Sequence, residues 1–163
     1  MHARLVLDTN TILALWMFRD PCLSELCEWI EGGDCILVTR EDALIELRHV
    51  LAYPQFGLDE TRQHMLMATY RARTELLTTA PSTEAQALPA CKDADDQKFL
   101  EIALDAGATS LITRDKALLK LARHRRVRER FAVMTPERFL SQLPLRQALS
   151  DVGADRSDSA AQR

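Results

Sequence analysis

The sequence lacks several patterns that mark well-known classes of protein. Its cysteines, Cys22, Cys27, Cys35 and Cys91, form no C-x-x-C pair, and no spacing of Cys and His matches a zinc site. No apolar run approaches the length of a membrane span, and the one near the start is too short for a signal segment. The net charge of −3 does not indicate a chain that coats nucleic acid by bulk charge. We expect a cytoplasmic protein with reduced thiols and no membrane contact.

What the 163 residues do contain is an ordinary globular composition, 47% hydrophobic and 28% charged. That length suits one domain with a proper core, which we place at residues 1–145. The remaining residues, 146–163, are polar and small, and we expect them to form a disordered tail.

Short apolar runs alternate with amphipathic segments along the chain. Buried strands are predicted at 4–8, 34–39, 109–115 and 131–134, with another short strand near 76–80. Helices are predicted at 21–33, 41–53, 58–77, 95–107, 116–122 and 135–143, and a loop at 81–90. Thr39 and Asp42 resemble a capping box for the second of these helices. The alternation predicts a single α/β domain, in which helices flank both faces of a central parallel sheet.

Two aspartates stand at predicted strand ends. Asp8 ends the first strand and Asp115 ends the strand at 109–115. In parallel sheets, ligands bind outside the carboxyl ends of the strands. A carboxylate that follows an apolar strand is also costly unless something satisfies it, so Asp8 in particular indicates a site.

Further acids lie on the helices around these strand ends. Asp93, Asp95 and Asp96 open the helix that precedes the second strand end, and Glu46 lies in mid-helix among apolar neighbours. Two carboxylates about 4 Å apart repel by about 4 kcal/mol at an effective dielectric near 20. A cluster of this kind therefore needs a cation, and Mg²⁺ or Mn²⁺ suits oxygen ligands. Acids that hold such an ion are typical of phosphodiester cleavage, in which the metal activates water.

Most of these acids also have an ordinary structural explanation. Asp93 and Asp96 suit the positive end of a helix, and Asp115 could cap the helix that follows it. Glu46 could pair with Arg48 or with a lysine of a neighbouring element.

Four stretches resemble the PIN domain family in their order and spacing. They are "LVLDTN", "ALIELRHVL", "DADDQKFLEIALDAGATSLITRD" and "MTPERFL", which together extend from about Leu5 to Leu143. The chain is similar to the branch of toxin components of toxin–antitoxin pairs, related to VapC ribonucleases. The resemblance implies a metal-dependent endoribonuclease with an RNA substrate, an antitoxin protein that covers the site, and a homodimer.

The same resemblance implies roles for particular residues. The catalytic acids would be Asp8, Glu46, Asp96 and Asp115. Three of them, Asp8, Asp96 and Asp115, would hold Mg²⁺ or Mn²⁺, and Glu46 would be a ligand or the base that orients water. Supporting residues would be Asn10, Thr113, Asp93 and Asp95.

Residues 123–130, "RHRRVRER", form the only dense basic run in the sequence. Arg125, Arg126 and Arg128 could follow an RNA backbone, or the run could be a solvated helix end. Trp16 and Phe18 could stack on bases, or they could belong to the core or to a subunit contact.

Other functions fit the sequence less well. A phosphotransfer domain of the response-regulator type needs an acid pair after its first strand, and that pair is absent. A haloacid-dehalogenase-type phosphatase needs D-x-D where Asn10 stands. The four histidines form no pattern that supports a Ser-His-Asp mechanism. The remaining alternative is a catalytically idle PIN scaffold that binds RNA or a protein.

Overall fold

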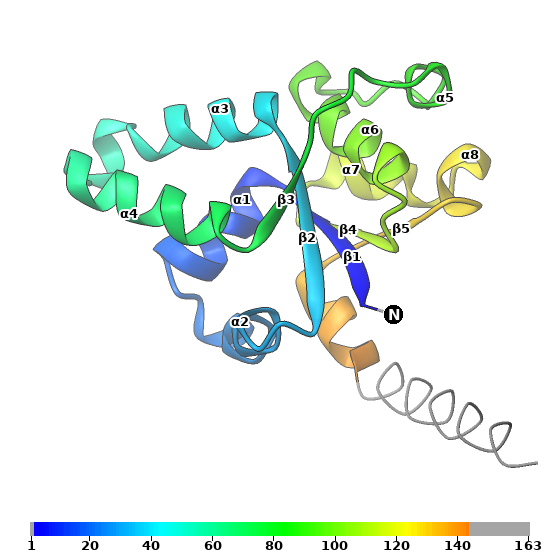
Figure 1. Ribbon diagram of the computed structural model, residues 1–163. Coiled ribbons are helices and arrows are strands. Elements are labelled where there is room, and N and C mark those ends of the chain that lie inside the picture. Colours follow the sequence, from blue (N-terminus) through cyan, green and yellow to red (C-terminus); the bar gives the residue numbers. More distant parts are fainter. Residues whose placement is uncertain (1, 144–163) are drawn as a thin grey trace, which may run out of the picture.

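The computed structural model describes residues 2–143, so the tail predicted at 146–163 lies outside the described residues. Five parallel strands form one sheet in the order β3-β2-β1-β4-β5 (Figure 1). The strands are β1 (Ala3–Leu7), β2 (Cys35–Arg40), β3 (Thr74–Leu77), β4 (Ser110–Ile112) and β5 (Ala132–Met134). The predicted α/β architecture with a parallel sheet is confirmed.

The first strand occupies the centre of the sheet. Leu5 of β1 pairs with Leu37 of β2, and Val6 pairs with Leu111 of β4. Leu5 and Leu7 belong to one buried cluster and Val6 to another, because successive side chains of a strand point to opposite faces. The continuous apolar run of β1 is therefore buried on both sides.

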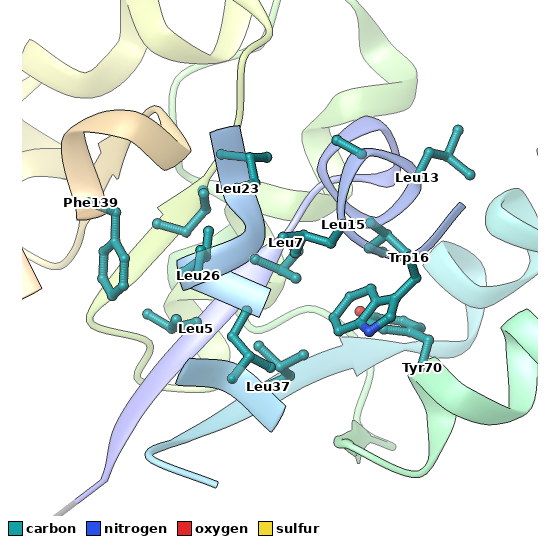
Figure 2. Close-up of a cluster of buried hydrophobic side chains, with 14 of the residues drawn as sticks. Leu5, Leu7, Leu13, Leu15, Trp16, Leu23, Leu26, Leu37, Tyr70 and Phe139 are labelled. Atoms are coloured by element: carbon teal, nitrogen blue, oxygen red, sulfur yellow. The ribbon is translucent and has the colours of Figure 1, made fainter. Parts of the chain in front are cut away.

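One face of the sheet is covered by helices from the first half of the chain and by the helix at 136–143. Leu5, Leu7 and Leu37 pack there against Leu26 and Phe139 (Figure 2). The covering elements are α1 (Thr9–Ile12), a π-helical turn η1 (Leu13–Met17), α2 (Ser24–Glu31), α3 (Glu41–Leu51), α4 (Glu60–Arg71) and the helical residues 136–143.

The opposite face is covered by helices from the second half of the chain. Val6 and Leu111 pack there against Phe99, Leu118 and Val127. Phe99, Leu118 and Val127 lie on α6 (Gln97–Asp105), α7 (Lys116–Lys120) and α8 (Arg125–Arg128), respectively. The shorter helices are η2 (Pro21–Leu23), η3 (Pro54–Phe56), α5 (Thr83–Gln86), η4 (Ala94–Asp96) and η5 (Leu121–Arg123).

Three local predictions were wrong. The helix predicted over 58–77 ends at Arg71, and the short strand predicted near 76–80 exists but begins earlier, at Thr74, because residues 74–77 pair with the edge of β2 and the sheet overrides their helical propensity. The loop predicted at 81–90 contains α5, which Ser82 caps. The capping box is absent, since Arg40 is the N-cap of α3 and its guanidinium instead binds Asp42 with two hydrogen bonds of 2.9 and 2.7 Å.

The two aromatic residues after the first strand have different surroundings. Trp16 is buried and its ring lies 5.8 Å from that of Tyr70, so it belongs to the core (Figure 2). Phe18 is 62% exposed and its ring lies edge-on to Phe56, 5.8 Å away.

No helix within residues 2–143 has both the length and the hydropathy needed to cross a lipid bilayer.

Candidate active site

Asp8 is a buried carboxylate that follows the central strand directly. Its backbone is extended and it is the N-cap of α1, where Oδ1 accepts a hydrogen bond from the amide of Thr11 at 2.8 Å. Oδ2 accepts from the hydroxyl of Thr113. Burial raises the pKa of Asp8 and the charge of Asp115 adds to this, while the hydrogen bonds oppose it. Asp8 is only 4% exposed, and two polar partners satisfy its buried carboxylate.

Thr113 connects Asp8 to the neighbouring strand. This fully buried residue follows β4, and its amide donates to the carbonyl of Met134, the last residue of β5, at 3.0 Å. Its hydroxyl donates to Asp8 and accepts from the amide of Asp115 at 2.9 Å. Thr113 therefore fixes the relative positions of two predicted site acids.

Asp115 caps α7. Its Oδ1 accepts from the amides of Ala117 and Leu118 at 2.8 and 3.0 Å. The strand β4 already ends at Ile112, so Asp115 belongs to the start of the helix and not to the strand end. The capping explanation is confirmed, and it occupies one of the two carboxylate oxygens.

Asp96 lies at the junction of η4 and α6, and its surroundings shift the pKa of its carboxyl group. Its pKa is raised to about 6, first by burial and then by the charges of Asp115, Asp93, Asp8 and Glu46. Asp96 makes no side-chain capping bond at the start of α6. The carboxylates predicted from separate parts of the sequence thus lie close enough to repel one another.

The predicted supporting residues at this edge include Asp93, Asp95 and Asn10. Asp93 caps η4, where its Oδ1 accepts from the amide of Asp95 at 3.0 Å. Asp95 is exposed, and its carbonyl accepts a hydrogen bond from the ammonium of Lys98. Asn10 is exposed, and its side chain makes no hydrogen bond to the acids within residues 2–143.

Glu46 reaches the cluster from α3 and is held by two donors. Its Oε1 accepts from Nζ of Lys98 on α6 at 2.9 Å, and its Oε2 accepts from the hydroxyl of Thr9. The Lys98 and Glu46 side chains are 14% and 26% exposed. The alternative that Glu46 pairs with a lysine of a neighbouring element is therefore confirmed.

A second ion pair joins α3, which carries Glu46, to α6, which begins directly after Asp96. The Arg40 guanidinium, next to the start of α3, donates to Glu101 of α6 at 2.8 Å and also holds Asp42. Its side chain is 11% exposed, so solvent screens this pairing little.

Comparison with known proteins decides the family. The PIN domain family matches residues 4–117, which include the four predicted catalytic acids. This chain belongs to the PIN domain family.

Solved structures agree with this PIN fold. A structure of PAE2754 from Pyrobaculum aerophilum superposes with a TM-score of 0.58 at 18% identity, covering 88% of this chain and 90% of that one. VapBC2 from Rickettsia felis, bound to a DNA fragment from their promoter, superposes with a TM-score of 0.52 at 14% identity, covering 80% of this chain and 96% of that one. Among curated proteins, no sequence gives a significant match.

The acids of this PIN domain suit a hard divalent cation by their chemistry. All the donors are carboxylate oxygens, and the raised pKa of Asp96 reflects a charge that a cation would compensate. Within residues 2–143, however, no three His, Cys, Asp or Glu side chains are placed around a common centre that would hold a metal ion. The carboxylates are gathered at one edge of the sheet without forming a finished coordination sphere.

The basic run is largely engaged within the PIN domain. Arg125 pairs with Glu129 at 3.0 Å, and Arg126 donates to the carbonyl of Ala87 at 2.6 Å. Arg128 is exposed and has no hydrogen bond or ion pair from its side chain in the described part of the chain. The idea that these arginines follow RNA stays a prediction.

Sequence reasoning missed the hydroxyl that Thr9 offers to Glu46 and the arginine that joins α3 to α6. Thr9 was visible as a polar residue directly after Asp8, but its partner is 37 positions away in the sequence. Arg40 lies at the end of a buried strand, and a charge at such a position was a signal that it has a buried partner.

Proposed function

We propose that this PIN domain is a metal-dependent endoribonuclease, the toxin of a toxin–antitoxin pair. One observation carries the proposal: the pKa of Asp96 is raised to about 6, first by burial and then by the charges of four other carboxylates, three of which, Asp115, Asp8 and Glu46, come from other elements. A fold gains nothing from such repulsion, which opposes stability. It is useful where a divalent cation and a phosphodiester are to be bound.

Asp8, Asp96 and Asp115 would hold Mg²⁺ or Mn²⁺ in this proposal. When bound, the ion would supply a Lewis acid that makes water more acidic and offsets negative charge on the phosphate. Asp115 keeps Oδ1 on the helix amides, so its other oxygen is the one free to serve. Thr113 keeps Asp8 in place and thereby sets its orientation.

Glu46 is the proposed base. Its carboxylate orients the attacking water and accepts its proton while the oxygen adds to phosphorus and the bond to the leaving ribose oxygen breaks. Lys98 and Thr9 hold the two Glu46 oxygens and keep the side chain directed at the cluster. Asn10, Asp93 and Asp95 have supporting roles at the rim.

The proposed partners are an RNA substrate, an antitoxin protein and a second copy of the chain, in the cytoplasm. Support for the antitoxin comes from the likeness to VapBC2 of Rickettsia felis and from the toxin-like motifs of the sequence.

A second candidate function is a catalytically idle PIN scaffold that binds RNA or a protein. The ion pair between Lys98 and Glu46 favours it, since an ammonium already compensates one acid of the cluster without a metal. Activity separates the two candidates.

The deciding experiment incubates the purified chain with structured and unstructured RNA, with and without Mn²⁺. We expect cleavage that requires the metal and falls at least about 100-fold in Asp8→Asn, because the amide retains the cap but not the charge. Asp59→Asn is the matched control, since Asp59 is an exposed cap of α4 in the same type of hydrogen bond. Cleavage without metal, or equal cleavage by Asp8→Asn, would refute the proposal, and wild-type binding without cleavage would favour the scaffold.

A further inference from the structure

A groove of about 830 Å³ lies between α7 and the edge strand β5. Leu119, Val133 and Met134 contribute apolar surface to its lining. Its other walls come from η5 and from the start of the helix at 136–143. Figure 1 shows α7 and β5 next to each other at this side of the sheet.

The charged residues that line this groove are all cations. They are Lys116, Lys120, Arg123 and Arg138, and no acidic residue lines the groove with them. All four are exposed, and within residues 2–143 none of their side chains forms an ion pair. A chain with a net charge of −3 therefore concentrates four unpaired positive charges in one hollow.

This cationic groove is connected to the acid cluster through the chain at two of its lining residues, Lys116 and Met134. Lys116 directly follows Asp115, and α7 continues from there for five residues, about 7 Å of rise. The other wall is connected in the same way, because the carbonyl of Met134 accepts from the amide of Thr113, whose hydroxyl binds Asp8. A strand of nucleic acid with one phosphate at the acids would thus continue along α7.

We propose that this groove binds the phosphate backbone of single-stranded RNA next to the scissile bond. The inference rests on the proposed ribonuclease function and names the path of its substrate. Lysine and arginine that line a groove bind phosphates without regard to sequence, and its apolar surface suits the faces of bases. The acids at one end repel the backbone unless a cation offsets them, so the groove supplies the affinity that the cluster lacks.

An acidic peptide added to the edge of β5 is the competing occupant. β5 has only three residues, and very short edge strands are poor templates for strand addition. The cations come from α7, η5 and the helix at 136–143 and not from the strand, so they favour a ligand recognised by its charge.

The test measures binding of a fluorescent single-stranded RNA of about 12 nucleotides, in EDTA so that no strand is cut. The variant is Lys120→Ala/Arg138→Ala, which removes one cation from each of two walls. Arg48→Ala/Arg62→Ala is the control, since it removes the same charge from exposed positions on α3 and α4. Poly-glutamate serves as the acidic competitor, and wild-type cleavage with Mn²⁺ is measured in parallel.

We expect the groove variant to bind RNA about 25-fold more weakly at 0.1 M salt, with a salt slope shallower by about 1.4, the amount for two lost phosphate contacts. The control should lose less than about 3-fold, as expected from net charge alone. The inference is overturned if the two variants bind RNA equally, or if poly-glutamate binding alone depends on the groove. Absence of wild-type cleavage with any divalent ion would refute the ribonuclease function while the binding comparison still reports on the groove.

Discussion

Lys98 donates a hydrogen bond from Nζ to Oε1 of Glu46 across 2.9 Å, joining α6 to α3 inside the acid cluster. The ammonium also binds the carbonyl of Asp95, at the turn that precedes Asp96. One lysine thus compensates an acid that the sequence places 52 positions away, and it sets the spacing of two helices that carry site residues.

Removing this cation should destabilise the fold. We expect Lys98→Met to lower the free energy of unfolding by about 1–2 kcal/mol at pH 7, because the pair is mostly shielded from solvent. The measurement is urea unfolding, with a double-mutant cycle through Glu46→Gln. Arg125→Met is the control, and it should change stability by less than about 0.5 kcal/mol since the Arg125 side chain is 80% exposed. Equal effects of the two substitutions would show that the site pair is as weak as a surface pair.

Asp96 should make stability depend on pH in a direction opposite to that of a salt-bridged acid. Its pKa is about 6 in the folded chain against an ordinary 3.8, so between these values the folded state binds more protons than the unfolded state. The stability that the fold loses by keeping Asp96 charged is zero below about pH 4 and reaches its full value above about pH 6. Asp96→Asn should therefore be more stable than wild type by about 1 kcal/mol at pH 8, after solvent screening, and equal to it at pH 4. Metal-free thermal melts at both pH values measure this, and a gain that is the same at both would contradict it.

The same variant tests the proposed role of Asp96 toward a metal. Saturating Mn²⁺ at about 100 times its dissociation constant should stabilise wild type by about 2.7 kcal/mol and raise Tm by about 5–10 °C. Asp96→Asn should gain less than half of that shift, and Asp59→Asn should gain all of it. Should Asp96→Asn gain as much as wild type, its carboxylate would be no ligand.

Two substitutions at Asp115 separate capping from the site. Asp115→Ala should cost about 1 kcal/mol of stability, because two amides of α7 lose their acceptor. Asp115→Asn should keep the cap and remain close to wild type in metal-free unfolding, yet lose RNA cleavage as severely as Asp115→Ala. Cleavage by Asp115→Asn at the wild-type rate would assign Asp115 to capping alone.

Some features of this PIN domain follow from the sequence because they depend on local pattern. The apolar run before Asp8 has the length and continuity of a strand buried on both faces, and β1 is that strand. Since parallel strands place their ligand sites at their carboxyl ends, an acid there predicts the edge of the sheet at which the site lies. The order of the four acids along the chain was likewise visible without coordinates, and their proximity accords with the electrostatics of Asp96.

Other features depended on partners that the sequence does not specify. The sequence predicts a helix to residue 77 and a short strand only near 76–80, but β2 offers an unpaired edge and residues 74–77 become β3. Residues 123–130 form a dense basic run in the sequence, yet Arg125 and Arg126 are held by Glu129 and Ala87. The cationic groove takes only Arg123 from that run and combines it with Lys116, Lys120 and Arg138, from segments that no local pattern connects.

By itself the sequence therefore determined the family, the sheet and the candidate acids, because periodicity and motif spacing are properties of consecutive residues. The tertiary structure alone decided that Lys98 pairs with Glu46, that Asp115 gives one oxygen to a helix and that Thr113 joins Asp8 to β5. The physical reason is that hydrogen bonds and ion pairs act over about 3 Å in space, whatever the separation along the chain.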